Sequence, residues 1–89
     1  MKSYRVDYSK KAVRTLKKLD PSMANLIYAW IEKNLVGCDN PRAHGKALGA
    51  NLSGFWRYRV GDFRLIAEIQ DDRLVILMIE IGHRSEVYN

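Results

Sequence analysis

The chain has only one cysteine among its 89 residues, Cys38, which excludes an intramolecular disulfide and a cysteine-based zinc site. Its longest apolar run, residues 74–79, is far too short to cross a bilayer, and the first residues lack the apolar segment of a signal peptide. Two histidines without suitably spaced carboxylates argue against a bound metal. There is no glycine-rich phosphate loop and no Gly-x-Ser-x-Gly elbow. These absences predict a cytoplasmic protein that uses neither a metal nor a cofactor.

Charge is the feature of the composition that points to partners. The chain carries 15 Lys and Arg against 10 Asp and Glu, a net charge of +5. An excess of positive charge indicates nucleic acid, an anionic membrane or an acidic protein as partner, although a basic but merely soluble surface is the alternative. The length suffices for a single domain over residues 1–89, with one hydrophobic core.

The first part of the chain predicts one strand and two helices. Residues 4–8 alternate weakly between apolar and polar side chains, which suits a short strand. Ser9 can cap a helix with its apolar positions on one face. Asp20 followed by Pro21 starts a second helix, which Gly37 can end. The short connection between the two helices predicts a helical hairpin.

After residues 38–54, which are rich in Gly, Asn and Pro and predict a loop, the period of the pattern changes to two. Three strands follow, at residues 55–60, 63–69 and 73–81, and the last is the most apolar. The order is β-α-α-β-β-β. It predicts an α+β fold in which the helical hairpin packs on one face of a mostly antiparallel four-stranded sheet.

The alternation places three arginines on the face of the sheet that the helices leave open. If Tyr58 and Leu65 point into the core, Arg57, Arg59 and Arg64 share the opposite face. Three guanidinium groups so close together repel one another unless an anion or an acidic partner lies between them. Solvated arginines paired with nearby glutamates are the alternative. Arginine suits phosphate because its planar fork binds two oxygens at once.

The last residues, after the most apolar strand, bring together side chains that can handle a phosphodiester. Arg84 can hold the charge of a phosphate, and the imidazole of His83 or the phenol of Tyr88 can transfer protons. Separately, His83 is as well explained as a surface residue and Tyr88 as an anchor. Their proximity to Arg84 and to the arginine face favours a site. A further set of basic residues, on the first helix and in the loop, is either a phosphate-contacting surface or a solvated one: Lys10, Lys11, Arg14, Lys17, Lys18 and Lys46.

Three segments of the chain carry a family resemblance. They are LSGFWRYRVG at residues 52–61, FRLI at residues 63–66 and IGHRSEVY at residues 81–88. With them the chain resembles the RelE toxins of the RelE/ParE superfamily of bacterial toxin–antitoxin systems. The length, the helical hairpin and the basic charge agree, so the resemblance covers essentially the whole chain.

The resemblance implies the toxin of a type II toxin–antitoxin system that cuts mRNA in the ribosomal A site. In such enzymes the 2′-hydroxyl attacks the adjacent phosphate without a metal, leaving a 2′,3′-cyclic phosphate and a free 5′-hydroxyl. The functional positions of the family correspond here to Arg57, Arg59, Arg64, Arg84 and Tyr88. The best-known RelE proteins have lysines at the first two. Since arginine stays protonated, proton transfer is expected from His83 or Tyr88, with Arg84 helping to position the RNA.

The same resemblance implies the partners and leaves two rival functions. We expect an acidic RelB-like antitoxin, the ribosome and mRNA as partners, operator DNA only for the toxin–antitoxin complex, and no membrane. One rival is a ParE-like toxin that poisons DNA gyrase through protein contacts and has no nuclease activity. The other is a catalytically inactive module that only binds its antitoxin and operator DNA.

Overall fold

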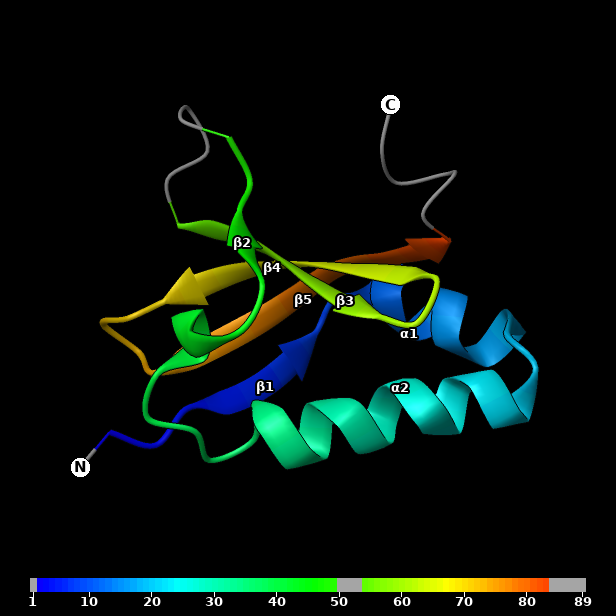
Figure 1. The fold of residues 1–89 in the computed structure, drawn as a ribbon, viewed down its shortest axis with the longest axis horizontal. Helices are drawn as coiled ribbons and strands as arrows, with labels where there is room; N and C mark the ends of the chain where they lie inside the picture. The colour runs from blue at the N-terminus through cyan, green and yellow to red at the C-terminus, as the bar shows by residue number, and fades with distance from the viewer. Residues whose placement is uncertain (1, 50–53, 84–89) are drawn as a thin grey trace.

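The computed structural model describes residues 2–49 and 54–83. It consists of a mixed sheet with two helices packed on it (Figure 1). Within these residues the strands are β1 (Arg5–Tyr8), β2 (Lys46–Ala47), β3 (Phe55–Val60), β4 (Phe63–Gln70) and β5 (Val75–His83). The helices are α1 (Lys10–Lys18), α2 (Pro21–Asn34) and the short 3₁₀ helix η1 (Pro41–Ala43). The strand order is β1-β5-β4-β3-β2, and only β1 and β5 pair in parallel. The predicted α+β fold with a helical hairpin is confirmed.

The number of strands differs from the prediction, because residues 38–54 are not wholly a loop. Lys46–Ala47 forms β2 and pairs with Arg57 and Trp56 at the edge of the sheet, so the described part of the chain has five strands instead of four. Two residues are too few to show a period of two in the sequence. The last strand also runs to His83, two residues beyond the predicted end.

Capping side chains explain where the helices begin. The Ser9 hydroxyl accepts a hydrogen bond from the Ala12 N–H (3.0 Å) and donates one to the Ile79 carbonyl (2.7 Å), which fixes α1 to β5. The Asp20 carboxylate accepts from the Ser22 N–H (3.3 Å) at the start of α2. After α2, Gly37 has a φ of 77° and donates its N–H to the Tyr4 carbonyl (2.7 Å). These starts and the glycine stop are the ones the sequence predicts.

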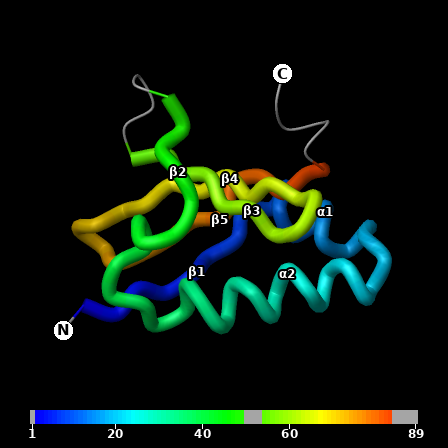
Figure 2. Tube along the Cα trace, viewed as in Figure 1, coloured from blue at the N-terminus to red at the C-terminus, as the bar shows by residue number. Residues whose placement is uncertain are grey.

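One core joins the helices to the inner face of the sheet. Helix α1 buries Leu16 and helix α2 buries Ile27, and both belong to the same cluster as Tyr58, Leu65 and Met78 of the sheet. Figure 2 shows α2 running along one side of the sheet while β2 rises on the other. Neither α1 nor α2 covers the outer face of β3 and β4, which carries partly exposed residues such as Arg57 and Arg64. Within residues 2–49 and 54–83, no helix has both the length and the apolar character needed to span a membrane.

Candidate active site

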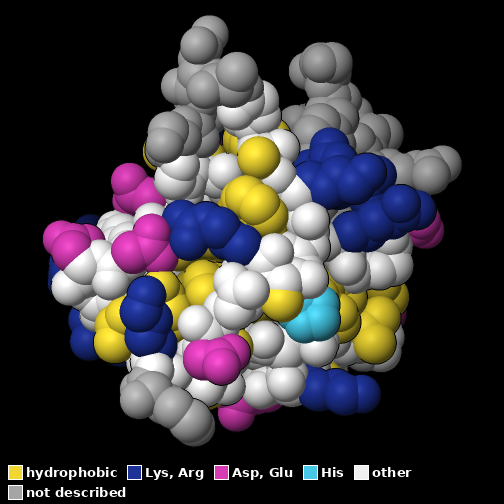
Figure 3. Space-filling model, turned by 60° about the vertical axis from the view of Figure 1, so that its left-hand side comes forward, with side chains coloured by type: hydrophobic (Ala, Val, Ile, Leu, Met, Phe, Trp, Pro, Cys, Tyr) yellow, Lys and Arg dark blue, Asp and Glu magenta, His cyan; other side chains and the backbone are white. Residues whose placement is uncertain are grey.

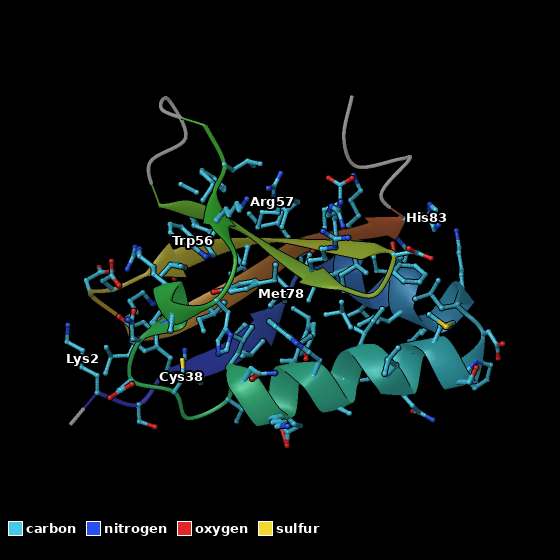
Figure 4. The ribbon with its side chains drawn as sticks, viewed as in Figure 1. Lys2, Cys38, Trp56, Arg57, Met78 and His83 are labelled. Carbon is cyan, nitrogen blue, oxygen red and sulfur yellow. The ribbon has the colours of Figure 1, made fainter. Side chains whose placement is uncertain are left out.

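The three arginines of β3 and β4 share the outer face of the sheet, as predicted. Tyr58 is fully buried on the inner face, so its neighbours Arg57 and Arg59 point outward. Arg59 lies directly opposite Arg64 across the antiparallel β3–β4 pair. Figure 4 shows Arg57 on the side of the sheet away from α2, and Met78 on the side that faces α2. Strand alternation and register thus bring the three guanidinium groups together.

A surface pocket of about 210 Å³ lies between these arginines and β2. Lys46 stands opposite Arg57 in the β2–β3 pair, so the pocket has a fourth basic side chain that comes from the predicted loop. The described residues that line it are Gly45, Lys46, Arg57, Arg59 and Arg64. None of these five is acidic, and the concentration of positive charge suits a phosphate group. On the face drawn in the space-filling view, Lys and Arg side chains gather in a patch at the upper right (Figure 3).

Among the described residues, two glutamates border the arginine face, and each has a contact of its own. Glu80 on β5 lies opposite Ile66, and its carboxylate is 3.4 Å from the Lys11 ammonium of α1. Glu68 on β4 accepts a hydrogen bond from the Gln70 amide at 2.9 Å. The Lys11–Glu80 ion pair also places the basic α1 beside β5. All five basic residues of α1 are exposed: Lys10, Lys11, Arg14, Lys17 and Lys18.

His83 lies at the end of β5, but its register directs it to the other face. It is opposite Phe63, whose side chain belongs to the core, whereas Gly82 is opposite Arg64. The His83 and Phe63 rings meet edge to face, with centroids 5.9 Å apart and planes at 81°. The structure therefore brings Arg57, Arg59 and Arg64 together, and His83 does not line their pocket. Arg84 and Tyr88 lie outside the described residues.

Gly45 is a pocket residue that the sequence analysis missed. Its φ is 76°, and a Cβ at this position would lie only 2.1 Å from the Arg57 carbonyl oxygen. Only glycine therefore allows the chain to approach β3 this closely just before Lys46. The glycine directly before a loop lysine was the available signal, but its meaning depends on a contact with a distant strand.

Other reactive groups in the described residues do not form a competing site. Burial raises the pKa of the Cys38 thiol, which opposes formation of a nucleophilic thiolate. No three His, Cys, Asp or Glu side chains within residues 2–49 and 54–83 lie close enough to hold a metal ion together.

Comparison with known proteins connects this geometry to a family. A family model described as the ParE toxin of type II toxin–antitoxin systems, parDE, matches residues 6–88. Toxin RelG of Mycobacterium tuberculosis is 28% identical over 85 residues, which cover 96% of this chain and 95% of RelG. A RelE-like toxin protein of Escherichia coli is 29% identical over 89 residues, covering 97% of this chain and 90% of that protein.

Solved structures give the same result for the fold. The toxin–antitoxin complex RelBE2 of Mycobacterium tuberculosis contains a chain with a TM-score of 0.81 and 28% identity, and the match covers 97% of both chains. The isolated Escherichia coli RelE toxin has a TM-score of 0.73 and 24% identity over 97% of this chain and 92% of that one. The family match spans nearly all described residues, pocket included. The chain therefore belongs to the ParE toxin family of type II toxin–antitoxin systems, in the RelE/ParE superfamily, and is a RelE-like toxin.

Proposed function

We propose that this toxin is an endoribonuclease that cuts mRNA in the ribosomal A site. The observation that carries the proposal is the pocket on the open face of the sheet, where Arg59 faces Arg64 and Arg57 faces Lys46. A pocket lined by four cations fits a phosphodiester, and guanidinium groups hold two of its oxygens at once. We infer from the resemblance to RelE toxins that the RNA is cut on the ribosome, in the A site.

In the proposed reaction the 2′-hydroxyl oxygen of the RNA attacks the adjacent phosphorus. As that bond forms, the bond between phosphorus and the 5′-oxygen breaks, which leaves a 2′,3′-cyclic phosphate and a 5′-hydroxyl. Negative charge grows on the phosphoryl oxygens in the transition state. Arg57, Arg59 and Arg64 stabilise that charge, because they are fixed on paired strands before the substrate arrives.

Proton transfer needs a different residue. A guanidinium stays protonated, so the arginines cannot take the proton of the 2′-hydroxyl. Tyr88 is the better candidate, since His83 lies opposite Phe63 on the other face. A phenol can accept this proton if nearby cations favour its phenolate form. We assign the base to Tyr88, with proton return to the 5′-oxygen, and assign Arg84 to holding the RNA in place.

Two substitutions separate the candidates for proton transfer. Tyr88→Phe keeps the ring and removes the hydroxyl, and we expect cleavage of ribosome-bound mRNA to slow by about 100-fold or more. His83→Ala is the matched variant, and we expect it to cut within a few-fold of the parent rate. If His83→Ala cleaves much more slowly than Tyr88→Phe, His83 is the base. If both variants cleave at the parental rate, neither residue is the base.

The exposed basic residues of α1 form a second surface for RNA in this proposal. Contacts between lysines and phosphates release counterions, so ribosome affinity falls steeply as salt rises. Replacement of both Lys17 and Lys18 by neutral residues should make the salt dependence of the affinity less steep, by the amount expected for the loss of about two phosphate contacts. An affinity that does not change with salt would contradict this role for α1.

An antitoxin is the second partner that we propose. Two of the matched structures are RelB–RelE type complexes, from Mycobacterium tuberculosis and Escherichia coli. The open face here carries Arg57, Arg59 and Arg64, so an acidic antitoxin segment has a complementary surface that it can cover. From the same resemblance we propose that operator DNA is bound only by the toxin–antitoxin complex and not by the toxin alone. The affinity of the toxin for its antitoxin, measured by titration calorimetry, should fall when the three arginines are replaced.

A gyrase-poisoning toxin is the second candidate function, because the family model that matches residues 6–88 is described as ParE. Such a toxin acts through protein contacts and needs no phosphate pocket. Expression in cells distinguishes the two functions. An endoribonuclease stops translation, whereas a gyrase poison triggers DNA-damage signalling. A catalytically inactive module does neither, and addition to translating ribosomes would leave mRNA intact.

A further inference from the structure

We propose that Lys46 is a fourth phosphate-binding group of the pocket and that the Arg42–Asp71 ion pair is the positioning device that keeps it there. The proposal rests on the proposed function, because it adds residues to the same site. It concerns the edge of the sheet at β2 and the loop that leads into it.

Strand pairing alone holds β2 weakly. The strand has two residues, lies at the edge of the sheet, and pairs with Arg57 and Trp56 of β3, with one further backbone hydrogen bond from the Leu48 N–H to the Phe55 carbonyl at 3.3 Å. So short a pairing supplies few backbone hydrogen bonds. Lys46 also stands directly opposite Arg57, and like charges opposite each other on neighbouring strands destabilise the pair. Something outside β2 must therefore keep Lys46 at the pocket.

The Arg42–Asp71 ion pair supplies that support four residues before Lys46. Arg42 donates from Nη1 and Nη2 to the two carboxylate oxygens of Asp71, each at 3.0 Å. Asp71 lies in the turn between β4 and β5 and also accepts from the Tyr4 hydroxyl at 2.7 Å. The Arg42 guanidinium lies 5.9 Å from the centre of the Trp56 ring. A bidentate pair fixes direction as well as distance, so it holds η1 against the sheet.

Residues 41–45, which contain Arg42 and lead into Lys46, have little freedom to move separately from β3. Pro41 is fully buried, and its carbonyl accepts from the Tyr58 hydroxyl at 2.7 Å. The His44 carbonyl accepts from the indole N–H of Trp56. Gly45 then lies too close to the Arg57 carbonyl for any side chain. Because each of these contacts is to β3 or its side chains, residues 41–45 follow β3 as one unit, and the Arg42–Asp71 pair fixes that unit to the turn between β4 and β5.

The test measures binding without cleavage, by NMR titration with a 2′-O-methyl RNA trinucleotide whose blocked 2′-oxygens cannot attack. We expect Lys46→Ala to weaken binding about fivefold, the loss of one exposed charge-assisted contact. Asp71→Asn should weaken it about threefold in the parent and have no further effect when Lys46→Ala is already present. Arg42→Gln breaks the same pair from the other side and should behave alike.

Asp72→Asn is the matched control, since it removes the same charge from the same turn without touching the Arg42–Asp71 pair. Parental affinity for Lys46→Ala would overturn the role of Lys46. An equal loss from Asp71→Asn in both backgrounds would show that it acts on general stability, which overturns the positioning role. The toxin could show the expected dependence of the Asp71→Asn effect on Lys46 and yet leave ribosomal mRNA intact. That result would refute the proposed nuclease activity while supporting the placement of Lys46.

Discussion

The two faces of the β3–β4 pair have opposite physical character, although they are built from alternate residues of the same strands. On the inner face Tyr58 and Leu65 are fully buried. On the outer face Arg59 and Arg64 stand side by side at the edge of a pocket. The inner face gains free energy from burial of apolar area, whereas the outer face concentrates like charges that repel one another.

Residues that stabilise the fold therefore alternate along each strand with residues that belong to the proposed site. A change at a buried inner position should alter the free energy of unfolding, and a change at an arginine of the outer face should alter RNA cleavage. The inner residues also fix the outer ones, because a strand that packs against the helices cannot rotate. The following predictions, from the largest effect to the smallest, test how cleanly the two faces divide these roles.

Arg64→Gln should have the largest effect, and it should fall on activity. Removal of one fixed donor to the transition state slows cleavage by about 100- to 1,000-fold. The free energy of unfolding should change by no more than about 1 kcal/mol. Single-turnover cleavage and urea unfolding measure the two quantities. Arg73→Gln, in the β4–β5 turn, is the control and should cut mRNA at the parental rate.

Leu65→Ala, one residue away, should reverse this pattern. Leu65 is fully buried, so its truncation leaves a cavity and lowers the free energy of unfolding by about 3 kcal/mol. Below the unfolding transition, the variant should still cleave within a few-fold of the parent. Leu26→Ala provides the comparison, since Leu26 is 50% exposed and its loss should cost less than about 0.5 kcal/mol. Similar losses for both leucines would contradict the contribution of the buried inner face to stability.

Tyr58→Phe tests the link between the faces. The ring lies in the core, and its hydroxyl donates to the carbonyl of buried Pro41 at 2.7 Å. Without that donor the carbonyl is left unsatisfied, which should cost about 1 to 2 kcal/mol of the free energy of unfolding. Thermal unfolding measures the change. No loss of stability would mean that the bond contributes little to holding the loop.

The smallest effect concerns the Asp71 turn and its pH dependence. The hydrogen bonds from Arg42, and then from Tyr4, hold the pKa of the Asp71 carboxyl below its usual range. A lowered pKa in the folded state stabilises the protein above about pH 4, and this contribution is lost as the pH falls through the folded value. The side chain is 50% exposed, so screening keeps the effect below about 1 kcal/mol.

Urea unfolding of the parent and of Asp71→Asn measures this contribution. The variant should be less stable than the parent at pH 7, and the difference should shrink at acid pH, as the pH falls through the folded pKa of Asp71. A difference that is the same at pH 7 and at acid pH would show that the carboxylate charge does not contribute.

The sequence predicts most of the fold, and the shared face of the three arginines, because the relevant signals are local. Ser9, Asp20 and Gly37 act on the residues next to them, so the helix boundaries follow from short patterns. Alternation within β3 and β4 likewise places Arg57 and Arg64 on one face without knowledge of the partner strands. Periodicity is sufficient wherever an element is long enough to repeat.

The remaining features depend on contacts between distant residues, which no local pattern encodes. Strand β2 has two residues, and its position depends on Gly45 against β3 and on Arg42 against Asp71. The direction of His83 depends on its register with Phe63, which includes an irregularity between Ile66 and Ala67. The sequence places His83 near the site but does not reveal the face to which it belongs.

The most direct test of the open face as an RNA-cleaving site is primer extension on an mRNA in a purified translation system, with end-group analysis of the products. We expect the parent toxin to cut within the A-site codon and to leave a 2′,3′-cyclic phosphate and a 5′-hydroxyl, and Arg64→Gln to leave nearly all mRNA intact. Intact mRNA with the parent toxin, or equal cutting by Arg64→Gln, would contradict this assignment of the pocket.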